Sequence, residues 1–200
     1  MQETRKGMLL VISGPSGVGK GTLFKRILEA DDSLTFSVSY TTRAARPGEV
    51  DGVDYHFVTD EEYDEMVAKD GFLEYANVHT DRYGTPRQPV EEALEKGLNV
   101  VLDIDPQGAL QVMTRKPDCV TVFILPPSFS VLRARLEGRG TETQEKIEKR
   151  LRNAREEVKL HDRYQYLLIN DDLEVAVEQL KDIVSAEKIR STRFFPVVGE

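Results

Sequence analysis

The residues with the clearest capacity for chemistry form a glycine-rich segment, SGPSGVGKGT, at residues 13–22. It follows the apolar run 8–12 and precedes a stretch with helical spacing of apolar residues, 23–30. Glycines allow positive φ and leave no side chains in the way, so successive N–H groups can point at one polyanion. The following helix adds the positive end of its dipole, and Lys20 can reach the β and γ phosphates of a nucleoside triphosphate. This context favours a phosphate-binding loop over a glycine-rich hairpin turn.

The residue after the lysine departs from the usual pattern of such loops. The pattern G-x-x-x-x-G-K-[ST] places a hydroxyl directly after the lysine, whereas this chain has Gly21 there and then Thr22. Mg²⁺ commonly keeps several waters and is held through substrate phosphates and one or two carboxylates. We therefore expect phosphates and water to hold most of the ion, with Thr22 as the nearest hydroxyl.

Length and composition narrow the class of protein. Two hundred residues suffice for one globular unit with an ordinary core. A net charge of −8 argues against binding a nucleic acid polymer, which depends on many unopposed basic residues. No apolar run approaches the ~20 residues of a membrane helix, and residues 1–7 lack the apolar core of a signal peptide, so we expect a cytoplasmic protein without membrane contact. The single cysteine, Cys119, lies in an apolar run and is expected to be a buried structural thiol.

Strands and helices are expected to alternate along most of the chain. Mostly apolar runs predict core strands at residues 8–12, 98–105, 119–125 and 166–169, the last strand of the chain. Helical spacing follows at about 107–115, after Ser128, along the stripe 147–158 and at 173–189. This order predicts a parallel α/β sheet flanked by helices, with residues 40–85 as an inserted lobe of shorter strands.

Local signals mark the elements of the inserted lobe. Residues 55–58 and 72–78 have strand character, and Thr59 with Glu62 forms a capping box that begins a helix closed at Gly71. Thr85 is expected to cap the next helix, which has a proline at its first position and stops at Gly97.

Two carboxylates, Asp103 and Asp105, end the apolar strand 98–105. Carboxylates there are costly to bury without a partner, so a functional role is favoured over simple capping of the strand end. A carboxylate in this position can reach Mg²⁺ directly or through water in a phosphoryl-transfer site.

A second cluster is basic. Residues 133–155 contain eight lysines and arginines against four glutamates, and a solvated helix face accounts for most of them. Arg135 and Arg139 flank a glycine-punctuated loop, and Arg150 lies on the returning helix, so closure can bring these three guanidinium groups onto a transferring phosphoryl group.

A third cluster falls in the inserted lobe. Two arginines three residues apart, Arg43 and Arg46, together with Tyr55 and Tyr83 provide the charge and hydroxyl donors of a clamp for a monophosphate. A carboxylate with nearby hydroxyls can read a base: Glu74 accepts the adjacent N1–H and N2–H₂ donors of guanine, and hydroxyls satisfy O6, a pattern that adenine lacks. The hydroxyls available are those of Ser39 and Thr85.

With these residues in view, the chain resembles the guanylate kinase family from Gly14 to about Lys188. The resemblance rests on GPSGVGKGT (14–22), FSVSYTTRAARPGEVDGVDYHFV (36–58), GFLEYANV (71–78), RYGTP (82–86), LDIDPQG (102–108) and RLEGRGTET (135–143). It implies the fold of P-loop nucleoside monophosphate kinases in one domain, residues 1–200. The core would comprise 1–38, 87–129 and 161–200, the GMP-binding lobe 39–86 and the helical lid 130–160.

The resemblance also implies an activity and its residues. ATP, with Mg²⁺ as cofactor, would phosphorylate GMP, and dGMP as well, by direct in-line transfer. The implied catalytic residues are Lys20, Arg43, Arg135, Arg139 and Arg150. The implied ATP-binding residues are Gly14, Pro15, Ser16, Gly17, Val18, Gly19, Lys20, Gly21, Thr22, Arg135, Arg139, Asn170 and Asp171. The implied GMP-binding residues are Ser39, Arg43, Arg46, Tyr55, Glu74, Tyr83, Thr85, Asp103, Asp105, Gly108 and Arg150. The metal would meet Asp103 through water, and Thr22.

Two other functions stay open on the sequence. One is a guanylate-kinase-like module that binds proteins without catalysis, which the intact glycine loop, Lys20 and the lid arginines disfavour. The other is a kinase for another nucleoside monophosphate or a sugar phosphate, which Glu74 with its neighbouring hydroxyls disfavours. A GTPase switch is weaker still, because the chain has no N-K-x-D motif. The sequence leaves self-association open.

Overall fold

The computed structural model describes residues 3–78, 81–138 and 143–196. Its central layer is a five-stranded parallel sheet in the order β10-β9-β2-β8-β3. The strands are β2 (Leu9–Ser13), β3 (Leu34–Phe36), β8 (Asn99–Asp103), β9 (Val120–Leu125) and β10 (Tyr166–Ile169). The central strands β9, β2 and β8 coincide with apolar runs because a strand covered on both faces exposes neither side to water. The predicted parallel α/β sheet is confirmed.

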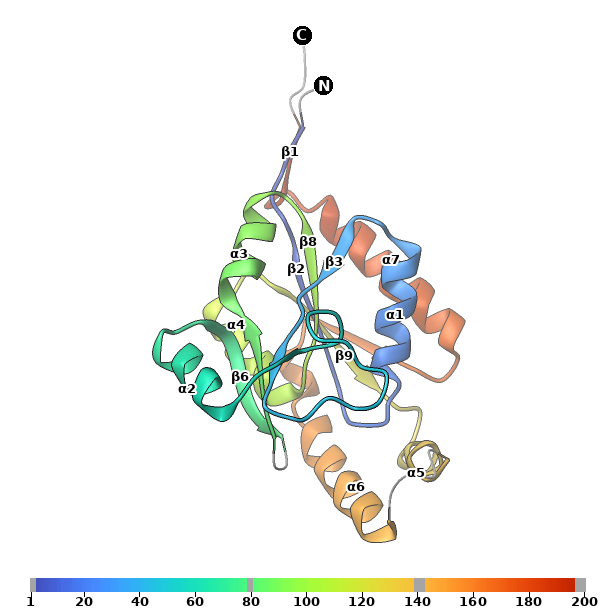
Figure 1. Cartoon of the computed structure of the whole chain (residues 1–200). Coiled ribbons are helices and arrows are strands. Elements are labelled where there is room, and N and C mark those ends of the chain that lie inside the picture. The colour runs from blue at the N-terminus through green and yellow to red at the C-terminus, as the bar shows by residue number, and fades with distance from the viewer. Residues whose placement is uncertain (1–2, 79–80, 139–142, 197–200) are drawn as a thin grey trace.

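Helices cover both faces of this sheet (Figure 1). The helices on one face are α1 (Lys20–Ala30) and α7 (Leu173–Lys188), and those on the other are α3 (Arg87–Glu95) and α4 (Pro106–Arg115). Alternate residues of β2 pack into the two layers, Leu10 with α1 and α7 and Val11 with α3 and α4. This two-sided core fixes the C-terminal ends of the strands, where α/β proteins bind ligands.

A second sheet of four strands forms the inserted lobe, in the order β5-β4-β7-β6. Its strands are β4 (Tyr40–Thr41), β5 (His56–Phe57), β6 (Phe72–Val78) and β7 (Asp81–Pro86), and β4 pairs in parallel with β5 while the other pairs are antiparallel. Helix α2 (Asp60–Ala68) begins at the predicted capping box. Tyr63 ties this helix to the sheet, because its hydroxyl donates to the Tyr83 carbonyl at 2.7 Å and its ring packs on Phe72.

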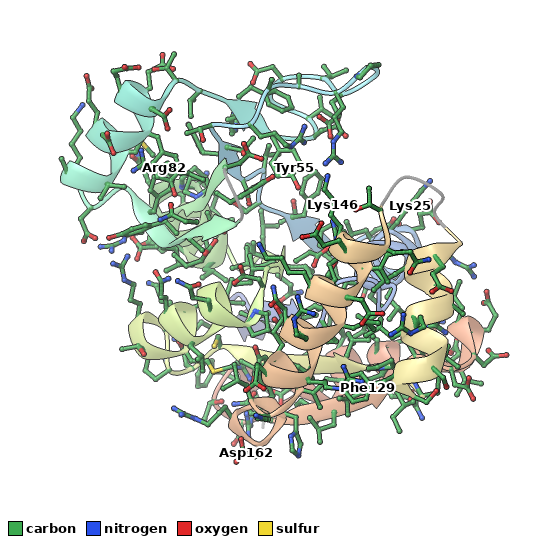
Figure 2. The ribbon with its side chains drawn as sticks, turned by 90° about the horizontal axis from the view of Figure 1, so that it is seen from below. Lys25, Tyr55, Arg82, Phe129, Lys146 and Asp162 are labelled. Atoms are coloured by element: carbon green, nitrogen blue, oxygen red, sulfur yellow. The ribbon has the colours of Figure 1, made fainter. Side chains whose placement is uncertain are left out.

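Two further helices, α5 (Phe129–Glu137) and α6 (Gln144–Val158), pack against each other and make up most of the segment that is expected to form the lid. Ser128 caps α5 as predicted, by accepting the backbone N–H of Val131. The pair has a small apolar core of its own, made by Leu132, Leu136, Ile147, Leu151 and Ala154. The guanidinium of Arg155 lies 4.9 Å from the centre of the Phe129 ring, which Figure 2 labels on α5. The short 3₁₀ helix η1 (His161–Arg163) then leads to β10.

The structure differs from the sequence prediction at three elements. Helix α1 begins at Lys20, before its apolar stripe. The first turn lacks apolar residues because it faces the cleft described below. Thr85 does not cap α3: it is fully buried in β7, and Pro86 occupies the position before the helix. The strand β10 is not the last, since β11 (Phe194–Pro196) pairs antiparallel with β1 (Glu3–Arg5). That pairing brings the two ends of the chain together (Figure 1), and contacts so distant in sequence leave no local pattern.

A buried charge network anchors the C-terminal segment to the core. Glu187 is only 3% exposed, and its carboxylate accepts hydrogen bonds from Arg193 at 2.5 Å and from the Tyr166 hydroxyl at 2.6 Å. Arg193, 5% exposed, also donates to the Asp118 carbonyl. A buried carboxylate needs such partners, since water cannot solvate it.

Replacing Arg193→Met should therefore lower the free energy of unfolding by about 3 kcal/mol, because it leaves the buried Glu187 carboxylate with fewer partners. Urea denaturation measures the change. The control is Lys181→Met, which breaks an exposed ion pair with Glu178 and should change stability by less than about 1 kcal/mol. Equal effects of the two substitutions would contradict a stabilising role for the network.

Candidate active site

A cleft of about 900 Å³ opens at the C-terminal ends of β2 and β8, between the core, the inserted lobe and α6. In Figure 2 the labelled Tyr55 comes from the lobe and Lys146 from α6. The core and α6 supply cleft residues Gly14, Pro15, Ser16, Gly17, Gly19, Lys20, Gly21, Thr22, Asp103, Asp105, Gln107, Arg150, Asn153 and Glu157. The lobe supplies Ser39, Arg43, Arg46, Glu49, Tyr55, Glu74, Asn77, Asp81 and Tyr83. The fold thus gathers most of the predicted site residues into one cavity.

The glycine loop connects the end of β2 to the start of α1. Gly14, Gly17 and Gly19 have φ of 146°, 87° and 98°, which disfavour any residue with a Cβ. A side chain at Gly14 would also meet the Ile124 carbonyl of β9. The Lys20 ammonium donates to the Gly14 carbonyl at 2.7 Å, across the mouth of the loop. The backbone therefore has the shape of a phosphate cradle.

Residues that were expected to contact ATP hold the glycine loop from outside the cleft. The Asn170 side chain, 5% exposed, donates to the Val18 carbonyl at 2.8 Å. Arg135 donates to the same carbonyl at 3.2 Å and to the Asn170 carbonyl at 2.9 Å. The Val18 side chain packs into the core. These three residues and Asp171 do not line the cleft.

Helix α6 brings further groups to the loop. The Arg150 guanidinium donates to the Ser16 hydroxyl at 2.5 Å. Glu157, one turn of helix from Asn153, has its carboxyl pKa raised by burial, while the charge of Lys20 lowers it. Arg139 lies outside the described residues, so its predicted position on the phosphoryl group stays a prediction.

The two aspartates at the end of β8 do different things. Asp103 ends the strand and lines the cleft. The protein atoms around it raise the pKa of its carboxyl, and the charge of Lys20 acts in the opposite direction. Asp105 caps α4 by accepting the Gly108 N–H at 2.7 Å, and it also lines the cleft. Gly108 itself is buried beside the Glu74 carboxylate, where a larger residue would clash.

Glu74 is the most deeply buried acid of the cleft, only 4% exposed. The Thr85 hydroxyl donates to its carboxylate at 2.7 Å. Thr85 lines an adjoining cavity of about 140 Å³ with Ser39 and Tyr55. Desolvation raises the Glu74 pKa to about 7, against the Thr85 hydrogen bond, which lowers it. Such a carboxylate, dehydrated but directed at a cavity, is suited to accept hydrogen-bond donors from a ligand.

Arg43, the first arginine of the predicted anion clamp, binds a carboxylate of the protein itself. The Arg43 guanidinium makes hydrogen bonds of 2.8 and 2.9 Å to both carboxylate oxygens of Glu49, which also accepts the Arg46 N–H at 2.7 Å. The same guanidinium lies 5.5 Å from the centre of the Tyr55 ring, and Tyr55 packs edge-on against Tyr83. The hydrogen bond from Arg43 holds the pKa of Glu49 below its usual range, so Glu49 stays anionic. The geometry is that of a site for one anion.

Sequence reasoning missed several residues of the cleft. Glu49, Asn153 and Glu157 belong to no cluster of matching chemistry in the chain, and each reaches the cleft only through folding. Their polar side chains were the sole signal, and polar side chains on a helix or in a loop are usually solvated surface.

Comparison with known proteins places this geometry in a family. The guanylate kinase family model matches residues 6–187. The chain is 52% identical to a guanylate kinase of Zymomonas mobilis over 98% of its length and 91% of that protein, and 46% identical to one of Clostridioides difficile over 98% and 96%. The crystal structure of guanylate kinase from Anaplasma phagocytophilum is similar, with a TM-score of 0.81, 34% identity, and coverage of 96% of this chain and 92% of that one.

Within the described residues, no helix is long and apolar enough to cross a membrane. The glycine loop, the buried carboxylate of the lobe and the arginine clamp lie in one cleft, and the family match spans all three. The chain therefore belongs to the guanylate kinase family.

Proposed function

We propose that this chain transfers the γ-phosphoryl group of ATP to GMP, and to dGMP, in a single in-line step that yields ADP and GDP. The observation that carries the proposal is the cleft itself, in which a phosphate loop with Lys20 shares one cavity with the buried Glu74. Family membership supports the same activity. A cytoplasmic location is part of the proposal.

GMP would bind in the lobe half of the cleft. Glu74 would accept the N1–H and N2–H₂ donors of guanine, with Ser39, Thr85 and Asp105 around the base. Arg43, Arg46, Tyr55 and Tyr83 would hold the GMP phosphate. In that case the phosphate takes the place of the Glu49 carboxylate on Arg43, since both are anions that suit a guanidinium fork.

ATP would bind in the core half. The loop N–H groups and Lys20 would hold its phosphates, and Arg135, Arg139 and Arg150 would neutralise charge on the transferring group. The GMP phosphate oxygen is already a nucleophile, so catalysis requires alignment, charge neutralisation and exclusion of water. No general base is needed.

The residues at the end of β8 fit a role for Mg²⁺. Asp103 lines the cleft with Lys20 and Thr22, and within the described part of the chain no hydrogen-bond donor reaches its carboxylate. No group of three or more acidic, histidine or cysteine residues that could hold a metal occurs among the described residues. One carboxylate, used through water, suits an ion that the ATP phosphates hold. When bound, Mg²⁺ would neutralise charge on the β and γ phosphates.

Replacing Lys20→Ala should reduce kcat by about 100-fold or more, because a charge directed at the transferring group is lost from a site that excludes water. A coupled assay of ADP release with GMP and ATP measures this. The matched control is Lys25→Ala on the exposed face of the same helix, which should keep wild-type turnover and stability. Turnover near that of wild type in Lys20→Ala would refute the assignment of the loop.

Replacing Glu74→Gln should lower kcat/KM for GMP by about 100-fold or more and leave the ATP dissociation constant unchanged. The amide can accept one guanine donor, but its NH₂ group faces the other and leaves it unpaired. The measurements are kcat/KM for GMP and AMP and the dissociation constant of ATP. If GMP use changed only a few-fold, or ATP binding weakened equally, Glu74 would not be the reader of guanine.

The same residue predicts a pH dependence. The Glu74 pKa is raised to about 7, so its carboxyl is protonated at lower pH and then offers guanine a donor in place of an acceptor. Accordingly, kcat/KM for GMP should fall as pH decreases below about 7, by about tenfold per unit. ATP binding over the same range should not follow this profile. A GMP profile that stays flat between pH 7.5 and 5.5 would exclude titration of Glu74.

A further inference from the structure

Helix α4 lies against the strand that carries Glu74. Gly108, Gln111 and Arg115 are spaced i, i+3 and i+7 along the helix, so they share one face. Each of them contacts β6 at or beside Glu74. The strand is at the edge of the four-stranded sheet of the described residues, and on its other side it pairs with β7.

Gln111 binds the residue directly after Glu74 through both ends of its amide. Its NH₂ group donates to the Tyr75 carbonyl at 2.8 Å, and its oxygen accepts the Tyr75 N–H at 3.2 Å. One side chain thus satisfies both main-chain groups of one residue on the edge strand, as a neighbouring strand would. This two-point contact fixes the rotation of the peptide groups next to Glu74, which a single hydrogen bond would leave free.

Arg115 binds the residues directly before Glu74. Its guanidinium donates to the carbonyls of Phe72 and Leu73, the latter at 3.2 Å. It also lies 3.5 Å from the Asp70 carboxylate, which Arg87 of α3 holds at 2.6 Å. The guanidinium is planar and rigid, so it can meet two carbonyls and a carboxylate together, which an ammonium cannot do.

These contacts lie on both sides of Glu74, whose carboxylate must point into the cleft to meet a ligand. Glu74 is also supported by the pairing of its strand with β7, by the Thr85 hydroxyl and by Gly108, which lies beside its carboxylate. The charged groups facing it are Asp105, at the start of α4, and Arg115, at its end, and the Tyr63 phenol faces it from α2. Of these groups, Asp105 raises the Glu74 pKa and Arg115 lowers it.

We propose that Gln111 and Arg115 are positioning residues for base recognition. By hydrogen-bonding the backbone of β6 on both sides of Glu74, they keep its carboxylate directed into the cleft before GMP binds. The inference rests on the proposed role of Glu74 as the reader of guanine. A ligand-binding group that is already in place saves the free energy of ordering it on binding, so its loss should weaken GMP binding rather than the chemical step.

The test uses the full-length enzyme with Gln111→Leu, Gln111→Asn, Arg115→Lys and Arg115→Met. The asparagine is too short to reach both groups of Tyr75, and the lysine keeps the charge but lacks the fork. Each substitution should raise KM for GMP by about tenfold, with kcat and KM for ATP within about twofold of wild type. Gln111→Asn and Arg115→Lys keep a polar group at each position, so they carry the comparison if an apolar variant fails to fold.

The pH profile separates the two residues. Loss of the Arg115 charge in Arg115→Met should move the midpoint of kcat/KM for GMP to higher pH, because the Glu74 carboxylate loses a stabilising cation. Arg115→Lys and both Gln111 variants should keep the wild-type midpoint, since they change no charge. A residue that merely stabilises the fold would not produce this pattern.

The matched control is Lys116→Met, at the end of the same helix, where the lysine pairs with Glu91 of α3. It should leave both KM values and the pH midpoint unchanged. The proposal is overturned if the four variants keep the wild-type KM for GMP, or if KM for ATP rises equally. Glu74→Gln distinguishes the two levels: if it impairs GMP use and the four variants do not, only the positioning role fails, whereas if it has no effect, the proposed base recognition fails.

Discussion

The structure depends on the close approach of the glycine loop to the backbone of β9. Gly14 passes so near the Ile124 carbonyl that no Cβ fits there, and its φ of 146° excludes other residues independently. This approach sets where the loop turns back into α1, and so where Lys20 and the first N–H groups of the helix point. Asn170 and Arg135 then fix the loop by holding the Val18 carbonyl from outside the cleft. In the described structure, the side chains of both residues therefore contact the backbone of the loop.

The other half of the cleft is organised around a dehydrated carboxylate. Burying the Glu74 carboxylate costs free energy, which the hydrogen bond from the Thr85 hydroxyl only partly offsets. The pKa of Glu74 is therefore raised. A ligand that supplies two hydrogen-bond donors would complete the set of partners, and sites built to hydrogen-bond a ligand discriminate strongly against analogues that lack those donors. The Arg43–Glu49 pair is the counterpart in the proposed phosphate clamp, since a carboxylate of the protein itself orders the Arg43 guanidinium there.

Helix α4 connects the two halves. Its N-terminal cap, Asp105, follows the strand that ends beside the phosphate loop, and its far end holds β6 through Arg115. A rigid helix between the core sheet and an edge strand fixes the lobe to the core at the level of Glu74. The scaffold thereby helps to place the side chains of the lobe that face the cleft relative to the loop.

The sequence by itself determined the layout of the core. Continuous apolar runs, the glycine spacing and capping residues such as Thr59 and Ser128 act within a few residues of the chain, and the structure bears out each of them. The sequence also assigned Glu74 and the arginines of the lobe to one binding chemistry, because their side chains have few other uses in such a pattern. It misplaced Thr85, since local capping preference is weaker than burial against Glu74.

Only the tertiary structure decided which polar residues meet. Glu49 on Arg43, Gln111 on Tyr75 and the pairing of β1 with β11 join groups whose separation along the chain carries no periodic signal. The physical reason is that periodicity reports which face of an element is buried, whereas a polar contact depends on the relative placement of elements that the hydrophobic core brings together. The chemistry of the cleft could thus be predicted from residue types, and its geometry required the fold.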